Sequence, residues 1–313
     1  MNDQTAVSVS VVMCTYNGSR FIEEQVKSIL TQTYSIEELI ISDDASTDTT
    51  CEILQQLAKQ DSRIRLVMQE KNLGFSNNFQ QAMMMAKATL LAPADQDDIW
   101  HPEKIERMVA AFASDASLIY CDSVKFSQHI PRAPKPNSKN KRMEGSDPRY
   151  LSVYNTVSGH AMLIRKTLLA TALPLPEGAY YDWWLAAVAM ANDRVQFLPE
   201  ILVFQRAHDR NVTLPTGISK ATQRHRFRET LVKHLKAFCT IPGLSTDEQS
   251  FFNEAYQYWE ASLRQRITVE LFFWLMKHRT IIYANKIRVF PIISQLKHSW
   301  IYSFRWRLQE GDN

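Results

Sequence analysis

The sequence predicts an α/β fold in which a mostly parallel sheet is flanked by helices and followed by a C-terminal helical extension. Two patterns predict this class. Apolar runs of strand length alternate with amphipathic runs of helix length between residues 7 and 121, a repeat typical of parallel sheets that are covered on both faces. From about residue 218 onward, only helix-like periodicity remains.

The first half is expected to contain nine elements in strict alternation. Strands are expected at 7–13, 39–42, 64–68, 90–94 and 118–121, and helices at 21–33, 47–59, 75–87 and 102–114. The first helix places Ile22, Val26 and Ile29 on one face. Ser46 is expected to cap the second helix, and Pro102 occupies a favoured first-turn position in the fourth.

The second half is expected to be less regular. Residues 127–150 are rich in proline and lysine and indicate a loop near the site. Further strands are expected within 150–165 and 194–206, separated by a helix that begins near Asp182. Helices are then expected at 221–239, 247–266, 268–284 and 292–308, the last of which alternates aromatic and basic residues.

Composition and charge narrow the class of protein. The chain of 313 residues is 45% hydrophobic and 22% charged, as in an ordinary globular protein. Residues 1–215 carry a net charge of −4 and residues 216–313 a net charge of +7, which suggests a basic appendage that meets something anionic. Four scattered cysteines lack metal-ligand spacing, so reduced thiols in the cytoplasm are expected. No apolar stretch reaches the roughly 18–20 residues that a membrane span needs.

The segment from Ala94 to Trp100 is the most informative in the chain. Asp95, Asp97 and Asp98 follow a buried apolar strand within four residues. Three carboxylates in that position repel one another unless a cation is near. A divalent ion held by Asp95 and Asp97 would bridge the phosphates of a diphosphate leaving group. The alternative is an acidic turn that leads into the next helix.

Polar residues also follow the first two predicted strands. Thr15, Tyr16 and Asn17 come after the first, and Asp43 and Asp44 come after the second. The carboxyl ends of parallel strands share one edge, where ligands of such sheets bind. A carboxylate of the Asp43–Asp44 pair is suited to a base N–H or a ribose hydroxyl. Tyr16 would stack on the base or pack against the sheet.

Four ordered motifs resemble family 2 glycosyltransferases of the GT-A fold over roughly residues 7–210. They are Ser10 to Gly18, Ile41 to Asp48, Asn72-Leu73-Gly74, and Asp95 to Trp100. The resemblance implies a Rossmann-like nucleotide-diphospho-sugar transferase domain at 1–217, with a nucleotide half at about 1–123 and an acceptor half at about 150–217. It also implies a nucleotide-diphosphate-sugar donor, Mn²⁺ or Mg²⁺, and inversion at the anomeric carbon. Residues 218–313 form the basic, aromatic helical region.

The resemblance also assigns roles to individual residues. Asp182, at a predicted helix start, is the candidate base, with a plain helix cap as the alternative. His160 and Trp183 are candidates for acceptor or sugar contact, or for packing. Arg206 and His208 would meet the diphosphate or the metal. The donor set comprises Thr15, Tyr16, Asn17, Asp43, Asp44, Asn72, Gly74, Asp95, Gln96 and Arg206; the acceptor or sugar set comprises Asp98, Trp100, His160 and Trp183; the metal set comprises Asp95, Asp97 and His208.

These assignments predict an inverting, metal-dependent transferase that moves one sugar to a glycan or lipid-linked acceptor in bacterial surface-polysaccharide synthesis. The donor favoured is dTDP-rhamnose, by resemblance to rhamnosyltransferase-like members, with UDP-galactose, UDP-glucose or UDP-N-acetylhexosamine as alternatives. A non-catalytic nucleotide-sugar-binding or scaffold protein is the rival function. The expected location is the cytoplasm or the inner face of the cytoplasmic membrane.

The basic region after residue 218 leaves two hypotheses open. It is either a surface for anionic lipid, with Trp and Tyr at headgroup depth, or a helical cap with a solvated basic face. Nucleic acid is not expected as a partner, because no recognised binding motif accompanies the charge.

Overall fold

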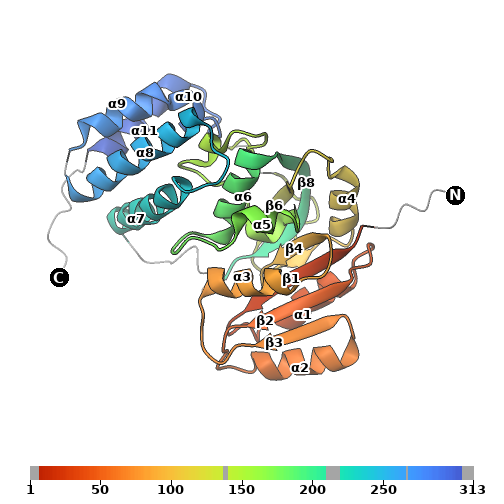
Figure 1. Cartoon of the computed structure of the whole chain (residues 1–313). Helices are drawn as coiled ribbons and strands as arrows, with labels where there is room; N and C mark the ends of the chain where they lie inside the picture. Colours follow the sequence, from red (N-terminus) through yellow and green to blue (C-terminus); the bar gives the residue numbers. More distant parts are fainter. Residues whose placement is uncertain (1–6, 137–139, 209–218, 266, 305–313) are drawn as a thin grey trace.

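The computed structural model describes residues 7–136, 140–208, 219–265 and 267–304, with a curved central sheet and a helical C-terminal region (Figure 1). The strands are β1 (Val9–Thr15), β2 (Glu38–Asp43), β3 (Ile64–Met68), β4 (Leu90–Ala94), β5 (Ile99–Trp100), β6 (Leu118–Phe126), β7 (Met162–Arg165) and β8 (Val195–Arg206). The helices of the first 208 residues are α1 (Ile22–Leu30), α2 (Thr50–Gln60), α3 (Phe75–Met85), α4 (Lys104–Ala111), α5 (Leu168–Ala172) and α6 (Tyr181–Asn192). Short 3₁₀ helices lie at η1 (Pro148–Leu151) and η2 (Gly159–Ala161).

The strand order places the carboxyl ends of three consecutive parallel strands side by side. The sheet runs β3-β2-β1-β4-β7-β6-β8-β5. β1 pairs in parallel with both β2 and β4, whereas β7 is antiparallel to β4 and β6. Parallel pairing requires crossover helices, which α1, α2 and α3 supply. The expected α/β class is therefore confirmed.

Side-chain alternation along β1 divides the core into two layers. Val9, Val11 and Met13 pack with residues of α1, α2 and α4 on one face of the sheet. Val12 belongs to the other layer, with residues of α3 and α6. Successive strand residues point to opposite faces, so one short apolar run serves both layers.

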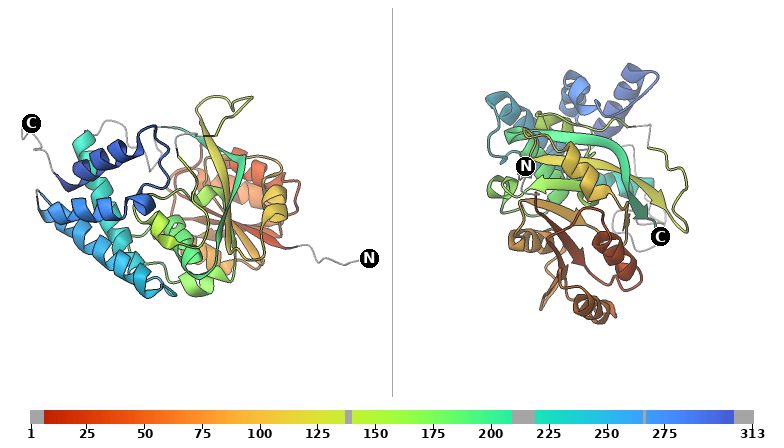
Figure 2. Two further views of the ribbon diagram at one scale, coloured as in Figure 1. Left: turned by 90° about the horizontal axis from the view of Figure 1, so that it is seen from above. Right: turned by 90° about the vertical axis from the view of Figure 1, so that its right-hand side faces the viewer.

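Helix α6 lies at the centre of the second layer. It is buried from Trp183 to Met190, because it carries apolar residues all around its surface, a composition typical of core helices. It packs between the sheet and the C-terminal helices (Figure 2). Its first turn holds Asp182 beside the carboxyl edge of the sheet.

The C-terminal region consists of α7 (Lys220–Phe238), α8 (Thr246–Arg264), α9 (Val269–Lys277), α10 (Arg279–Ile282) and α11 (Pro291–Ser303). Ser245 and Glu248 form a reciprocal capping box at the start of α8. Arg228 of α7 donates to the carbonyl oxygens of Ile301 and Tyr302, which ties α11 to α7. No helix in the described ranges has both the length and the apolar run that crossing a bilayer takes.

Several local expectations are wrong. Ser46 does not cap α2, which begins at Thr50, because its hydroxyl instead donates to Asp43. Pro102 precedes α4, whose first residue is Lys104. Of residues 150–165, which are expected to hold a strand, only Met162–Arg165 form one (β7), and Tyr150 and Leu151 belong to η1. Part of the expected helix at 292–308, including Arg305, Trp306 and Arg307, lies outside the described residues, as does the predicted domain boundary at residues 217 and 218.

Candidate active site

The ends of β1 and β2 are joined by a buried carboxylate. Asp43 is almost fully buried and accepts hydrogen bonds from Thr15 Oγ1 at 2.7 Å and from the backbone N–H and hydroxyl of Ser46 at 2.8 and 2.6 Å. The Ser46 hydroxyl in turn accepts from the Asn17 N–H at 2.8 Å. Asn17 has φ of 50°, a left-handed conformation that asparagine tolerates well. The predicted donor residues Thr15, Asn17 and Asp43 thus form one hydrogen-bonded unit.

Asp44 fixes a second loop at the same edge. Its carboxylate accepts from the backbone N–H groups of Leu73 and Gly74 at 2.7 and 3.0 Å, and its carbonyl oxygen accepts from Asn72 Nδ2 at 3.1 Å. Gly74 has φ of 81°, which favours glycine over other residues. The structure therefore brings Asp44, Asn72 and Gly74 together, and Asp44 positions the loop that precedes α3.

Tyr16 and Gln96 connect the loop after β1 to the acidic loop after β4. The Tyr16 N–H donates to Gln96 Oε1 at 2.9 Å, and Gln96 Nε2 donates to the Tyr16 carbonyl at 3.1 Å. A Cβ at Gly18 would lie 2.2 Å from Gln96 Oε1, so a larger residue there would displace the Gln96 side chain from this pair. The Tyr16 ring itself is about half exposed. A face is therefore open for a base to stack on.

Three predicted site residues gather into a cluster of potential cation ligands. One ligand atom from each of Asp95, Asp98 and His160 lies within 4.8 Å of the others. His160 Nδ1 is 3.2 Å from Asp95 Oδ2 and 3.7 Å from Asp98 Oδ2. Among the described residues, the buried Asp98 Oδ2 has no hydrogen-bond partner. A buried carboxylate oxygen without a partner is costly, so its position fits a cation ligand.

The charges of this cluster favour a cation beside the carboxylates. Burial raises the pKa of Asp98 to about 7, an effect that His160 opposes and that Asp95 and Asp97 reinforce. Burial alone would lower the pKa of His160. The nearby carboxylates of Asp98 and Asp95 outweigh this effect, so the pKa of His160 is raised. Carboxylates and an imidazole at this spacing are ligands suited to Mn²⁺ or to Mg²⁺.

Asp97, His208 and Arg206 form a neighbouring group. His208 Nε2 lies 2.6 Å from Asp97 Oδ2. The Arg206 N–H donates to Asp98 Oδ1 at 3.2 Å, and its guanidinium donates to the Asp97 carbonyl and pairs with Glu24. The structure thus brings the predicted metal residues Asp97 and His208 together. The cluster of three potential ligands, however, combines Asp95 with Asp98 and His160 and not with Asp97 and His208. The segment after them, 209–218, lies outside the described residues.

Asp182 lies at the start of α6, one residue after its first position. Its Oδ1 accepts from the Trp183 N–H at 2.7 Å. Burial raises the pKa of Asp182 to about 6, with the Trp183 and Gly159 N–H groups opposing and Asp95 reinforcing the shift. That value suits a general base near neutral pH. The residue that caps α6 is Tyr180, which provides no side-chain cap.

Two tryptophans of the predicted sugar-contact set are mostly covered by protein. Trp100 is buried, with Lys104 Nζ 3.3 Å from its ring centroid. Lys104 donates to the His160 carbonyl at 2.8 Å, so it helps to position the backbone of His160. The Trp183 indole donates to the Leu151 carbonyl, and its ring packs on His234 with centroids 4.3 Å apart. In this conformation Trp100 offers no face to a sugar.

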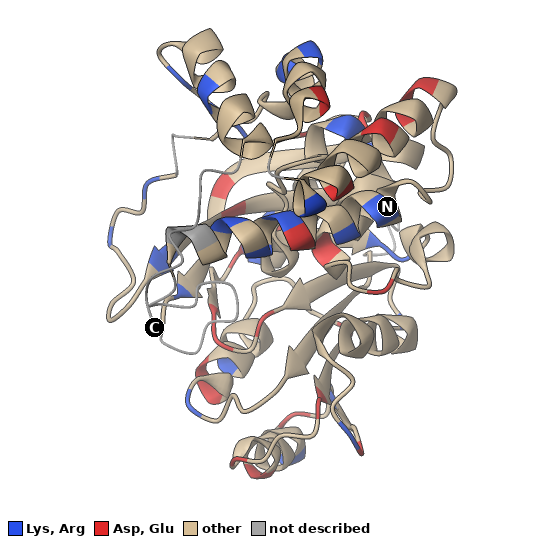
Figure 3. Cartoon of the chain, turned by 90° about the vertical axis from the view of Figure 1, so that its left-hand side faces the viewer, with Lys and Arg blue, Asp and Glu red and all other residues tan. Residues whose placement is uncertain are grey.

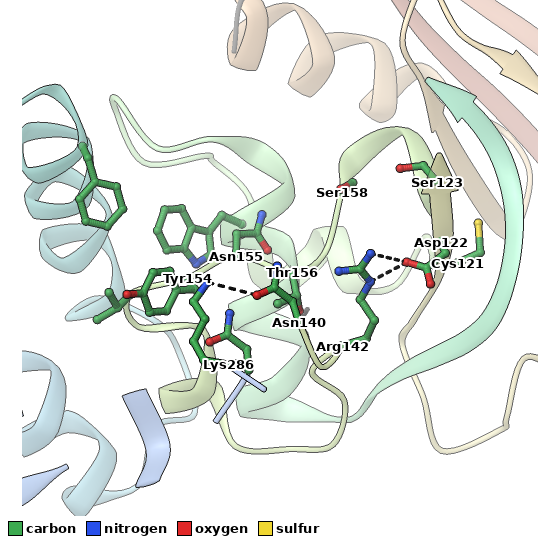
Figure 4. Close-up of a pocket in the computed structure, with 14 residues that line it drawn as sticks. Cys121, Asp122, Ser123, Asn140, Arg142, Tyr154, Asn155, Thr156, Ser158 and Lys286 are labelled. Carbon is green, nitrogen blue, oxygen red and sulfur yellow. Dashed lines mark hydrogen bonds and ion pairs between the residues drawn. The ribbon is translucent and has the colours of Figure 1, made fainter. Parts of the chain in front are cut away.

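A cavity of about 330 Å³ is lined by residues of the first 208 residues, including Ser158 and Trp183, and by residues of the C-terminal region (Figure 4). Ser158, Trp183, Asn155 and Thr156 are among its lining residues, and Lys286 reaches it from the C-terminal region. Its other lining residues are Cys121, Asp122, Ser123, Asn140, Arg142, Val153, Tyr154, Phe227 and Asn285.

The charged groups of this cavity differ in how they are paired. Arg142 and Asp122 form an ion pair at 2.5 Å. Lys286 Nζ donates to Asn140 Oδ1 at 3.3 Å and lies 4.1 Å from the Tyr154 ring centroid. Burial lowers the pKa of Lys286. Sequence reasoning missed Asn285 and Lys286, since no motif marks them and they lie more than 100 residues beyond Asp182.

A curved, mostly parallel sheet with an acidic loop at its carboxyl edge defines the GT-A class of nucleotide-diphospho-sugar transferases. Two solved structures share it. TarS of Staphylococcus aureus with UDP-GlcNAc has a TM-score of 0.62 at 16% identity, over 94% of this chain and 89% of that chain. The mannosyltransferase PcManGT of Pyrobaculum calidifontis with GDP-Man and Mn²⁺ has a TM-score of 0.58 at 16% identity, over 93% and 78%. At this identity the likeness establishes the fold.

Sequence comparison establishes the family. The model of glycosyl transferase family 2 matches residues 10–171, and the chain belongs to this family. An uncharacterized glycosyltransferase of Haemophilus influenzae is 39% identical over 101 residues, 32% of this chain and 31% of its own length. The Escherichia coli enzyme named UDP-Glc:alpha-D-GlcNAc-diphosphoundecaprenol beta-1,3-glucosyltransferase WfgD is 35% identical over 102 residues, 33% of this chain and 40% of its own length. The match thus spans well under half of either relative.

Proposed function

We propose that this chain is a metal-dependent, inverting glycosyltransferase that moves one sugar from a nucleotide-diphosphate donor to a glycan or lipid-linked acceptor in bacterial surface-polysaccharide synthesis. The observation that carries the proposal is the cluster of Asp95, Asp98 and His160, in which a buried carboxylate oxygen lacks a partner among the described residues. Asp182 lies beside this cluster, close enough for Asp95 to reinforce the shift in its pKa.

The donor would lie across the carboxyl ends of β1, β2 and β4. The half-exposed ring of Tyr16 offers a stacking face for the base. The loops fixed by Asp43 and Asp44 supply polar groups for the nucleoside. Arg206, whose backbone N–H donates to the Asp98 carboxylate, supplies a cation near the diphosphate.

Asp95 and Asp98, with His160 or the Asp97–His208 pair, would hold the divalent ion. When bound, Mn²⁺ or Mg²⁺ would neutralise charge on the diphosphate. The geometry favours Asp98 over Asp97 as a ligand, because Asp98 Oδ2 accepts no hydrogen bond from any described residue and lies 3.7 Å from His160 Nδ1, whereas the Asp97 carboxylate is 2.6 Å from His208.

Asp182 would act as the base. The acceptor oxygen forms a bond to the anomeric carbon, the bond from that carbon to the diphosphate oxygen breaks, and the acceptor proton passes to the Asp182 carboxylate. Attack from the face opposite the leaving group inverts the anomeric centre. The cavity that Trp183, the residue after Asp182, helps to line would receive the acceptor, because its walls carry hydroxyl and amide groups suited to sugar hydroxyls.

Two classes of donor remain in this proposal. The sequence resemblance favours dTDP-rhamnose. Two similar proteins support a UDP-hexose instead: the name of WfgD gives UDP-Glc as its donor, and TarS was solved in complex with UDP-GlcNAc. Calorimetric titration of the full chain with dTDP, UDP and GDP, each with and without Mn²⁺, separates them. Tight binding of one nucleotide that requires Mn²⁺ is the expected result.

Variants make this test specific to the site. Asp98→Asn should weaken Mn²⁺-dependent nucleotide binding by at least about tenfold, since it removes a charged ligand. Asp115→Asn, at an exposed surface ion pair, is the matched control and should bind as wild type does. Nucleotide binding that is indifferent to Mn²⁺ and to Asp98→Asn would overturn the metal assignment. Metal-dependent binding without turnover on any donor would favour the scaffold function.

A further inference from the structure

The C-terminal helices expose an unusual amount of apolar side chain. Val289 is 88% and Phe290 69% exposed, in the segment that joins α10 to α11. We define the apolar surface as the large exposed hydrophobic residues of this region: Ile267, Val269, Phe273, Ile287, Val289, Phe290, Ile292, Ile293, Leu296 and Trp300. Most soluble monomers avoid exposed apolar patches of this kind, which mark binding surfaces.

These residues form faces and are not scattered singly. On α11, Ile292, Ile293, Leu296 and Trp300 recur at helical spacing, so they share one side of the helix. On α9, Val269 and Phe273 lie one turn apart, while Leu271 and Leu275 are buried on the opposite side.

An aromatic side chain joins the two helices. Phe272 has its ring centroid 5.6 Å from that of Phe273 and 6.2 Å from that of Trp300. The exposed faces of α9 and α11 therefore adjoin one another. Trp300 lies at their junction, and tryptophan is favoured where an apolar face meets water.

The charge around the apolar surface selects its partner. Residues 267–304 contain the cations Lys277, Arg279, Lys286, Arg288 and Lys297 and the single acid Glu270. Arg288 and Lys297 are exposed within the apolar stretch itself, and Figure 3 shows Lys and Arg on the C-terminal helices of this side. A second copy of the chain would bring like charges together, whereas an anionic bilayer offers the complementary charge.

We propose that α9, α11 and the segment between α10 and α11 form a membrane-docking surface for bilayers that contain anionic phospholipid. Val289, Phe290 and Ile293 enter the interface between headgroups and acyl chains, while Arg288 and Lys297 meet lipid phosphates.

The position of the acceptor cavity fits this proposal. Asn285 and Lys286 line the cavity, and the exposed segment begins at the next residue, Ile287. Asn285 is almost fully buried, and its Oδ1 has no hydrogen-bond partner in the part of the chain that the structure describes. One short segment thus connects the docking surface to a polar cavity that Trp183, the residue after Asp182, also lines, so a lipid-linked acceptor would enter the cavity while its lipid stays in the bilayer. That last step rests on the proposed transferase function; the docking itself does not.

The test is flotation of the purified full chain with vesicles. Vesicles of phosphatidylcholine and phosphatidylglycerol should carry the protein upward, and vesicles of phosphatidylcholine alone should do so far less. The double variant Val289→Ser/Phe290→Ser should lower the partitioning of the protein onto these vesicles at least about tenfold, because it removes two highly exposed apolar side chains. Arg288→Glu should remove most of the preference for phosphatidylglycerol, with each basic residue worth about fivefold.

Met84→Ser is the matched control, since Met84 is also an exposed apolar side chain, at 62%, but lies on α3 and not on the C-terminal helices. It should bind vesicles as wild type does. Equal thermal unfolding temperatures for wild type and the double variant would show that folding is intact. Failure of wild type to float with phosphatidylglycerol, or equal flotation of the double variant, would overturn the proposal. So would light scattering that shows a dimer that the double variant dissociates, because a second copy would then cover the surface.

Nucleotide binding, measured on the same samples, keeps the two proposals apart. A chain that binds nucleotide with Mn²⁺ but ignores vesicles contradicts only the docking surface. A chain that floats but binds no nucleotide contradicts only the transferase.

Discussion

Replacing Asp182 by asparagine should harm transfer and stabilise the fold. Asparagine has nearly the same shape and retains an oxygen to accept the Trp183 N–H, but it cannot take a proton from the acceptor. Loss of a general base typically slows a reaction about 10²- to 10⁴-fold. Nucleotide binding should survive, because the Asp182 side chain accepts hydrogen bonds from the Trp183 and Gly159 N–H groups and not from the donor loops.

The stabilisation follows from the pKa of Asp182. The carboxyl has a usual pKa of 3.8, and burial raises it to about 6 in the folded chain. The folded state therefore disfavours the ionised form, so the cost is absent below about pH 4 and complete above the folded pKa. With 1.36 kcal/mol per pKa unit, Asp182→Asn should raise the free energy of unfolding by about 3 kcal/mol at pH 8 and by about half as much at pH 5.

Urea denaturation of wild type and Asp182→Asn at both pH values measures this difference, and transfer to acceptor is assayed on the same preparations. Asp193→Asn, just beyond the other end of α6, is a matched control that should change neither quantity much. A variant that still transfers sugar at the wild-type rate would refute the role as base. A stability difference that does not grow between pH 5 and pH 8 would refute the electrostatic reasoning, whatever happens to the rate.

Three further outcomes are expected. The wild-type transfer rate should fall about tenfold per pH unit below about pH 6, as Asp182 becomes protonated, and a rate profile that is flat down to pH 5 would contradict this. Gly18→Ala should weaken nucleotide binding at least about tenfold, because its Cβ would lie 2.2 Å from Gln96 Oε1, and calorimetry would detect the loss. Lys104→Met should raise the unfolding temperature more at pH 6 than at pH 9. Burial lowers the pKa of Lys104 to about 7, so the charged amine that dominates at pH 6 is disfavoured in the folded state. A difference in unfolding temperature that does not change with pH would count against this explanation.

Local sequence patterns predict the fold of residues 7–126 well. Strand periodicity and the polar residues after β1, β2 and β4 depend on neighbours in the chain, so Thr15, Asp43 and Asp95 fall at one edge as expected. The helix near Asp182 is also predictable, because its apolar run is long and continuous.

The remaining details depend on contacts between distant segments. Ser46 looks like a helix cap in the sequence, but the Asp43 carboxylate is a stronger partner once β2 is in place. Asp98 and His160 meet only because η2 follows the loop that crosses the end of β4, and no spacing rule connects them. The burial of Trp100 depends on Lys104, a lysine that most sequence reasoning would place in solvent.

The amide pair between Tyr16 and Gln96 has a thermodynamic consequence. It exchanges two hydrogen bonds between the loop that would meet the base and the loop that would meet the phosphates. A shift of either loop therefore moves or strains the other, and the two halves of a donor would bind cooperatively. Binding energy from contacts to the nucleotide base would then help to align the anomeric carbon. Sugar diphosphates that lack the nucleoside should therefore lose turnover as well as affinity.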